Sequence, residues 1–308
     1  MKKIVALLLT LSMCFGLLSG CGSSGSKEAA AEQPAGSAPA ASGAAEGGDA
    51  LTTVTEGKLT VATSPDFAPY EFYALDENNT PSLAGFDVAL AQYIADYMGL
   101  ELEMVTVDFD GVLSELQTGS VDLGMAGLSP DPKREAIMDF SDIYYEGGQS
   151  LVTVKANADK ITSFEDINSS EFTVGAQTGS IQLDLANANT PNANIVSMPK
   201  VTDIISELLA GKEFAAFIET DVAKSYQKNY PDLEIVMDVP YDQEGSAIGV
   251  NKGNAALLAK VNEAIAAAKE DGSLENFIAE ANEQASGDKY EGLLDENGAA
   301  PAEEASAE

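Results

Sequence analysis

The chain has no histidine, no tryptophan and only two cysteines among its 308 residues. Without histidine it lacks the commonest general base and the commonest zinc ligand. Basic residues are also scarce, with 16 against 50 acidic ones, a formal net charge of −34 at pH 7. Such a chain will not bind nucleic acid or an anionic membrane surface through its charge. Ser-His and Cys-His catalysis are excluded, whereas an enzyme that uses carboxylates alone is not.

The first twenty residues have the pattern of a secretory signal peptide. Two lysines precede an apolar run over 4–18, which is too short to span a bilayer comfortably. The run ends in Leu18-Ser19-Gly20-Cys21, which resembles a bacterial lipobox, in which the signal is cut before the cysteine and the thiol is lipidated. An ordinary secretory signal with a chance cysteine is the alternative. We predict a signal peptide over 1–20 and a lipidated Cys21 that anchors an extracytoplasmic protein to the cell membrane.

The other cysteine, Cys14, lies in the predicted signal, so the mature chain would contain no disulfide.

Low-complexity segments flank the central part of the chain. Residues 21–56 are expected to be the lipidated cysteine and a flexible linker of Ala, Gly, Ser, Glu and Pro, and residues 287–308 a disordered acidic tail.

The intervening residues alternate between strand-like and helix-like patterns. Strands are predicted over 58–63, 100–107, 121–126, 171–176, 194–197 and 214–218, and helices over 85–98, 109–118, 180–189, 202–210 and 221–229. This order predicts two α/β units with parallel sheets. Extended segments at 149–155 and 247–252 are expected to join the units, and helices over 254–270 and 273–281 to pack back on the first. The predicted lobes are 57–150 with a return segment 247–286, and 151–246.

One group of candidate site residues follows the strand predicted over 121–126. Ligands of open parallel sheets bind beyond the carboxyl ends of the strands. Gly127 would let a ligand approach the backbone, and Asp131 would cap a helix whose start can hold an anion. Arg134 offers a planar fork for a carboxylate. Alternatively, Arg134 pairs with Asp131 or Glu135 at an exposed helix start.

Four weaker candidates follow other predicted strands. The aromatic loop over 64–72 lies at the end of the first strand, where it lines a site or plugs the core. The segment 107–111 places another aromatic at the same edge. The turn over 177–182 precedes a helix and is a possible anion nest. Glu219 either balances a cation in the cleft or is a helix N-terminal acid.

From residue 59 to about residue 278 the chain resembles the polar amino-acid-binding proteins of ABC importers, solute-binding protein family 3. The matching stretches are LTVATSPDFAPYEF, GFDVALAQYIADYMGL, VDFDGVLSELQTGSVDLGMAGLSPDPKREAIMDFSDIYYEGGQSLV, VGAQTGSIQ and SAIGVNKG. The resemblance implies an α/β fold, a two-lobed type II periplasmic-binding-protein-like clamshell with two crossover strands.

The resemblance also implies roles for individual residues. Arg134 would bind the α-carboxylate of the ligand, and Glu219 its α-ammonium, where many members have Asp. Phe67 would stack on the ligand side chain, with Phe109 facing it. Several cationic-amino-acid binders have Asp where this chain has Ser64. The complete predicted ligand-binding set is Ser64, Asp66, Phe67, Phe109, Ala126, Gly127, Ser129, Arg134, Gln177, Ser180, Ile181 and Glu219.

The predicted function is therefore capture of a polar amino acid (arginine, lysine, histidine or glutamine) and its delivery to an ABC permease. We expect a monomer that acts without cofactor, metal or nucleic acid. Two alternatives stay open. One is an enzyme on the same fold, such as a dehydratase of cyclic carboxylic acids that uses Glu219 or Asp66 as acid or base. The other is a sensory module that reports occupancy to a receptor.

Overall fold

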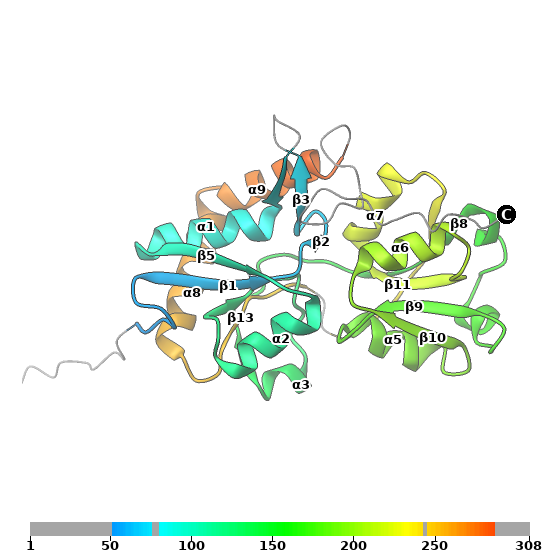
Figure 1. Cartoon of the computed structure of the whole chain (residues 1–308), viewed down its shortest axis with the longest axis horizontal. Helices are drawn as coiled ribbons and strands as arrows, with labels where there is room; N and C mark the ends of the chain where they lie inside the picture. Colours follow the sequence, from blue (N-terminus) through cyan, green and yellow to red (C-terminus); the bar gives the residue numbers. More distant parts are fainter. Residues whose placement is uncertain (1–50, 76–79, 243–244, 287–308) are drawn as a thin grey trace, which may run out of the picture. The chain divides into compact units, whose positions relative to one another are not determined.

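A computed structural model describes residues 51–75, 80–242 and 245–286 (Figure 1). The predicted signal peptide, Cys21, nearly all of the predicted linker and the acidic tail lie outside these ranges. Across the described ranges, every helix is too short or too polar to cross a membrane.

The first large sheet has the strand order β5-β1-β6-β13-β7. Its members are β1 (Lys58–Thr63), β5 (Glu101–Thr106), β6 (Leu123–Gly124), β7 (Met138–Phe140) and β13 (Gly249–Asn251). Strand β1 runs parallel to β5 and β6, whereas β13 runs antiparallel to β6 and β7. We call the part of the chain around this sheet lobe 1.

The second large sheet has the order β10-β9-β11-β8-β12 and forms what we call lobe 2. Its members are β8 (Gln149–Val154), β9 (Thr173–Gln177), β10 (Asn194–Met198), β11 (Ala215–Glu219) and β12 (Leu233–Asp238). Strands β9, β10 and β11 are parallel, and β8 is antiparallel to β11 and β12. Each lobe thus contains the predicted parallel strands, extended by antiparallel ones.

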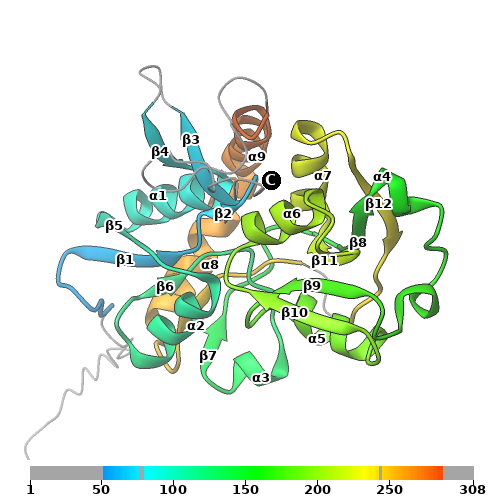
Figure 2. The ribbon, with the colours of Figure 1, turned by 45° about the vertical axis from the view of Figure 1, so that its right-hand side comes forward.

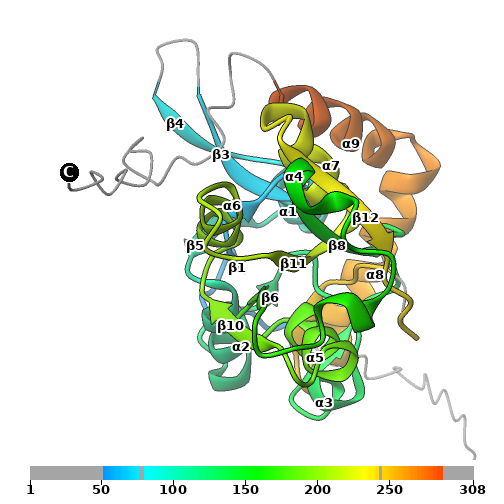
Figure 3. The ribbon, with the colours of Figure 1, turned by 90° about the vertical axis from the view of Figure 1, so that its right-hand side faces the viewer.

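Helices cover both faces of each sheet (Figures 1 and 3). Lobe 1 contains α1 (Phe86–Met98), α2 (Phe109–Thr118), α3 (Pro132–Glu135), α8 (Ala255–Glu270) and α9 (Ser273–Gln284). Lobe 2 contains α4 (Lys155–Ala158), a 3-10 helix (Phe164–Ile167), α5 (Ile181–Asn189), α6 (Val201–Leu209) and α7 (Thr220–Asn229). Helices α8 and α9 pack against α1 of lobe 1.

Local signals in the sequence set the ends of several helices. Gly99 adopts a left-handed conformation (φ 68°) and ends α1, as predicted, because glycine has no Cβ to oppose it. Asp131, Ser180 and Asn254 cap α3, α5 and α8, with each side chain accepting a backbone N–H. These residue types therefore fix the helix starts that the sequence indicates.

The crossing between the lobes differs from the prediction. The segments expected to join the lobes form β8 and β13, strands within the two sheets, and the chain crosses just before each of them. There the two crossing segments run antiparallel, with Ser246 N–H donating to Tyr145 O (2.7 Å) and Tyr144 N–H to Ser246 O (2.9 Å). Extended sequence alone does not distinguish a connector from a strand, because both have the same backbone conformation.

A small third sheet, which the sequence did not predict, sits beside α1. It contains β2 (Asp66–Phe67), β3 (Glu71–Leu75) and β4 (Pro81–Ala84). A strand of two residues is too short to show a period of two. This sheet holds the aromatic loop after β1 in place, because Asp66 pairs with Phe72 and Phe67 with Glu71.

Candidate functional site

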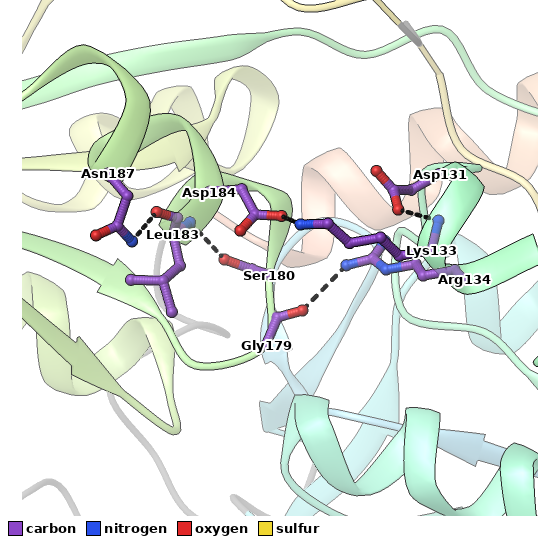
Figure 4. Close-up of polar contacts among 8 residues, drawn as sticks. All are labelled: Asp131, Lys133, Arg134, Gly179, Ser180, Leu183, Asp184 and Asn187. Carbon is purple, nitrogen blue, oxygen red and sulfur yellow. Dashed lines mark hydrogen bonds and ion pairs between the residues drawn. The ribbon is translucent and has the colours of Figure 1, made fainter. Parts of the chain in front are cut away.

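Arg134 is buried at the junction of the two lobes, with 7% of its surface exposed. Its Nη1 donates to Ser129 O in lobe 1 (3.0 Å), and its Nη2 donates to Gly179 O in lobe 2 (3.2 Å), as Figure 4 shows for the second bond. The guanidinium carbon lies 5.4 Å from the centroid of the Phe109 ring. Asp131 is occupied as a helix cap, with its carboxylate accepting the Lys133 N–H at 2.7 Å.

The charge on Arg134 therefore faces carbonyl dipoles and an aromatic ring. Burial lowers its pKa, and the ion pairs of the described residues do not include it. A buried guanidinium is costly unless an anion compensates it. Its planar fork matches a carboxylate. The arrangement is thus suited to hold a carboxylate group that enters between the lobes.

A second contact between the lobes lies at the surface. Lys133 Nζ and Asp184 Oδ2 are 2.7 Å apart, with the two side chains 77% and 60% exposed (Figure 4). Exposed ion pairs of this kind contribute about 0–1 kcal/mol. The buried contacts of Arg134 therefore matter more for the geometry of the site.

Glu219 ends β11 and is 3% exposed. Its Oε2 accepts the Val222 N–H at 2.8 Å, and its Oε1 accepts the Tyr70 hydroxyl of lobe 1 at 3.3 Å. Glu219 is thus a helix N-cap and also a contact between the lobes. Burial raises the pKa of its carboxyl to about 7, so a cation brought beside it would favour its ionised form.

Asp66 is equally buried and has several partners. Its Oδ1 accepts the Ser64 hydroxyl at 2.6 Å. Its Oδ2 accepts Gln177 Nε2 at 3.0 Å and the Val201 N–H at 2.5 Å, both from lobe 2. Burial raises the pKa of its carboxyl to about 6. The structure therefore brings Ser64, Asp66 and Gln177 of the predicted set together in one hydrogen-bonded group.

Gly127 has a structural requirement that the sequence did not reveal. It adopts φ +56°, and a Cβ atom there would lie 2.7 Å from Phe67 Cε1. Its N–H donates to Asp87 Oδ2 at 3.2 Å, and Asp87 Oδ1 accepts the Tyr144 hydroxyl at 2.6 Å. The space beside Gly127 is filled by the ring of Phe67, and the amide is engaged within lobe 1. Close approach of a ligand to this backbone stays a prediction.

The remaining predicted residues are divided between the lobes. Ser180 caps α5, accepting the Leu183 N–H at 3.2 Å, and donates to Gln177 O at 2.7 Å. Ile181 is the first residue of α5, and Ala126 is buried beside β6 in lobe 1. Phe67 packs in an apolar cluster with Tyr70, whereas Phe109 packs in a separate cluster with Ala126. That the two rings face each other across a ligand stays a prediction.

Sequence reasoning missed three residues that hold the site. Tyr70 lies in the aromatic loop and contacts Glu219, Asp87 supports Gly127, and Tyr241 Oη lies 3.2 Å from Ser129 Oγ. Tyr70 and Asp87 lie in segments that match the family in the sequence. Their roles become clear only from their distant partners, Glu219 and Gly127. In residues 51–75, 80–242 and 245–286, no three acidic, histidine or cysteine side chains are grouped so as to hold a metal ion.

Comparison with known proteins finds relatives among amino-acid-binding proteins. The arginine-binding extracellular protein ArtP of Bacillus subtilis is 30% identical over 281 residues, covering 90% of this chain and 96% of ArtP. An amino acid ABC transporter substrate-binding protein, AbpA of Streptococcus pneumoniae, solved bound to L-arginine, superposes with a TM-score of 0.71 at 34% identity, covering 74% of this chain and 96% of AbpA.

A further solved structure, the ancestral amino-acid-binding protein AncCDT-1, a precursor of cyclohexadienyl dehydratase, superposes with a TM-score of 0.66 at 32% identity, covering 73% of this chain and 95% of that one. These neighbours confirm the predicted two-lobed type II fold. Residues 59–281 match the family model of bacterial extracellular solute-binding proteins, family 3. This chain belongs to that family.

Proposed function

We propose that this chain captures a free polar amino acid outside the cytoplasm and delivers it to the permease of an ABC transporter. The observation that supports this most directly is the buried Arg134, held by carbonyls of both lobes and in no ion pair among the described residues. An amino acid supplies that carboxylate and an ammonium group on the same carbon. Glu219 is the acceptor for the ammonium.

Dividing these two partners between the lobes couples binding to closure. Arg134 belongs to lobe 1 and Glu219 to lobe 2, so a zwitterion contacts both only when the lobes meet. Each charge-assisted hydrogen bond contributes about 1.5–3 kcal/mol. A ligand shifts the balance between open and closed forms only through such differential contact.

The ligand class follows from the remaining side chains and from the relatives. Phe67 and Phe109 offer faces for a flat or extended side chain, and a guanidinium adds about 0.5–2 kcal/mol of cation–π attraction. Arginine is favoured because ArtP and AbpA are described as binding it. Lysine, histidine and glutamine follow. Acidic ligands are disfavoured by the net charge of −34.

A thermal-shift screen of the twenty amino acids on the purified chain tests this function. We expect the largest rise in unfolding temperature with L-arginine or another of the four favoured amino acids. Stabilisation by aspartate and glutamate alone, or by leucine and valine alone, would defeat the proposed ligand class. No shift with any amino acid would defeat the function.

An enzyme on the same fold is the second candidate, because AncCDT-1 is described as a precursor of a dehydratase. Its acid or base would be Glu219 or Asp66. Asp66 is already engaged by three donors, and Glu219 is the proposed partner of the ligand ammonium. We propose that the chain is a binding protein, which returns its ligand unchanged. Incubation with the stabilising ligand, followed by mass spectrometry of the released molecule, separates the two.

The lipid anchor is proposed from Leu18-Ser19-Gly20-Cys21 alone. Replacement of Cys21 by alanine should abolish fatty-acid labelling and either release the protein or leave it unprocessed. The matched control is Cys14→Ala, which removes the other cysteine and should keep the label. Metabolic labelling with a radioactive fatty acid measures this. Equal labelling of the wild type and Cys21→Ala would exclude the anchor.

Gly147 is expected to position Glu219 for the ligand. A Cβ atom at position 147 would lie 2.6 Å from Glu219 Oε1 and 2.9 Å from the Tyr70 hydroxyl. Gly147→Ala should therefore displace the carboxylate and weaken ligand binding by about 1 kcal/mol or more. The loss should shrink when Glu219→Asp is added, because the shorter side chain withdraws from the new methyl group. Contacting residues typically show such a coupling of roughly 0.5–3 kcal/mol.

Gly148→Ala is the matched control for Gly147→Ala. A Cβ atom there meets only Thr220, at 3.0 Å from its hydroxyl oxygen, so a smaller effect on affinity is expected. Titration calorimetry with L-arginine on wild type, Gly147→Ala, Glu219→Asp and the double variant gives the coupling energy between the two positions. Strictly additive losses would show that Gly147 does not act through Glu219.

A further inference from the structure

Helix α6 begins without a cap from its own sequence. Its N-cap residue is Lys200, which makes no side-chain capping bond. Lysine is a poor choice there, because the first backbone N–H groups need an acceptor and the N-terminal end of a helix carries partial positive charge. The nine residues of α6 nevertheless form a regular helix with buried Val201, Ile204 and Leu208.

The missing acceptor comes from the other lobe. Asp66 in β2 accepts the Val201 N–H, the first of the helix, at 2.5 Å through Oδ2. The same oxygen accepts Gln177 Nε2 at 3.0 Å, and the backbone carbonyl of Asp66 accepts the Tyr226 hydroxyl at 3.1 Å. Strand β2 and α6 are in contact and lie side by side in Figure 2. One residue of lobe 1 thus meets three donors of lobe 2.

The surroundings of these bonds exclude water. Asp66 is 5% exposed and Val201 is 2% exposed. One apolar cluster contains Phe67 and Ala68 of lobe 1 together with Val201 and Ile204 of lobe 2. Hydrogen bonds are stronger in such low-dielectric surroundings, and a donor left unpaired there is correspondingly costly. When the lobes separate, the hydrogen bond from the Val201 N–H to the Asp66 carboxylate breaks.

The carboxylate has little capacity left for a ligand. A carboxylate has about four acceptor positions, and three donors from Ser64, Gln177 and Val201 already occupy it. None of these donors belongs to Arg134 or Glu219, the proposed partners of the ligand. Asp66 is therefore held by Ser64, Gln177 and Val201 and not by the proposed charged partners of the ligand.

We propose that Asp66 is a positioning residue, which caps α6 across the lobe junction and so raises ligand affinity through closure, without touching the ligand. This proposal rests on the proposed function, since closure matters only if a ligand is held between the lobes. It gives Asp66 a role other than the direct ligand contact that the sequence predicts.

Two substitutions in the mature full-length chain test the proposal. Asp66→Ala removes the acceptor, so that the Val201 N–H is left unpaired in the closed form and Gln177 Nε2 keeps only its bond to Pro199 O (3.1 Å). Asp66→Asn keeps an acceptor oxygen and loses the charge. We expect Asp66→Ala to weaken binding of L-arginine and of L-glutamine by the same factor, roughly 3- to 30-fold, the equivalent of a lost N-cap. Asp66→Asn should stay within about threefold of wild type for both ligands.

Hydrogen–deuterium exchange of the first turn of α6 gives a readout that does not depend on affinity. Saturated with L-arginine, Asp66→Ala should exchange the Val201 amide faster than wild type does, while the protection of α1 stays unchanged. Asp66→Asn should restore the protection.

Three outcomes would overturn the capping role. They are an Asp66→Ala affinity within a factor of two of wild type, unchanged exchange at Val201, and a loss in both variants confined to arginine, which would make Asp66 a ligand contact. If wild type bound none of the twenty amino acids, the proposed function would fail. The exchange of unliganded wild type and Asp66→Ala at Val201 would then still decide whether Asp66 caps α6.

Discussion

Replacement of Arg134 by alanine is expected to weaken the binding of L-arginine by about 2–5 kcal/mol, roughly 30- to 4,000-fold. The side chain is 7% exposed, and the carbonyls of Ser129 and Gly179 fix its fork from both lobes. Removing it would leave the ligand carboxylate in a buried site without its counter-charge. Titration calorimetry measures the loss directly.

Two controls define what the loss means. Lys133→Ala removes the neighbouring, exposed cation with its ion pair to Asp184, and affinity should stay within about twofold because such pairs contribute little. Arg134→Lys keeps the charge and loses the planar fork, so an intermediate affinity is expected. An Arg134→Ala protein that binds within a factor of two of wild type would refute the assignment of Arg134 to the carboxylate.

The sequence predicts the helices of this fold well, because their signals are local. The apolar spacing and flanking residues predict a helix over 109–118, and α2 spans Phe109–Thr118. Asp131 and Ser180 occupy the N-cap positions that their chemistry favours. The sequence did not predict β2, β7 and β12, which are short or half-buried and show no clear alternation.

The sequence predicts where the candidate site lies, but not which of its residues contact one another. The positions at the ends of β1, β6, β9 and β11 follow from the rule that ligands bind beyond the carboxyl ends of parallel strands. The partners within the site do not. Asp66 and Val201 are 135 residues apart, and Tyr70 and Glu219 are 149 apart. No local period reports such contacts, so the sequence places these side chains in one region without showing which atoms meet.

Gly127 shows the same limit at a single residue. A glycine after a buried strand predicts close approach of something to the backbone. In the structure the ring of Phe67 lies against this backbone. A Cβ atom on residue 127 would be only 2.7 Å from Phe67 Cε1. The sequence therefore indicates that position 127 must lack a side chain, but not that the Phe67 ring fills the space beside it.

Gly85→Ala is expected to have the largest effect on stability, lowering the free energy of unfolding by about 4 kcal/mol. Gly85 adopts φ 117° and ψ 164°, a backbone region that is essentially restricted to glycine. A Cβ atom there would lie 2.1 Å from Tyr70 O and 2.9 Å from Glu71 Cα. Both are backbone atoms, so no side-chain rotation relieves the overlap, and β3 would have to move away from α1.

The matched control is Gly99→Ala, where φ is also positive (68°) but a Cβ atom would have nothing within 4 Å. This variant carries only the cost of the left-handed conformation, about 1–2 kcal/mol. Urea unfolding followed by circular dichroism compares the two variants, and the unfolding temperature of Gly85→Ala should fall by roughly 8–16 °C. Ligand affinity should fall as well. The Phe86 and Asp87 amides that bind Pro69 O (3.1 Å) and Tyr70 O (2.9 Å) hold the aromatic loop in place. Equal destabilisation by the two substitutions would show that the contact with Tyr70 is not what requires glycine at position 85.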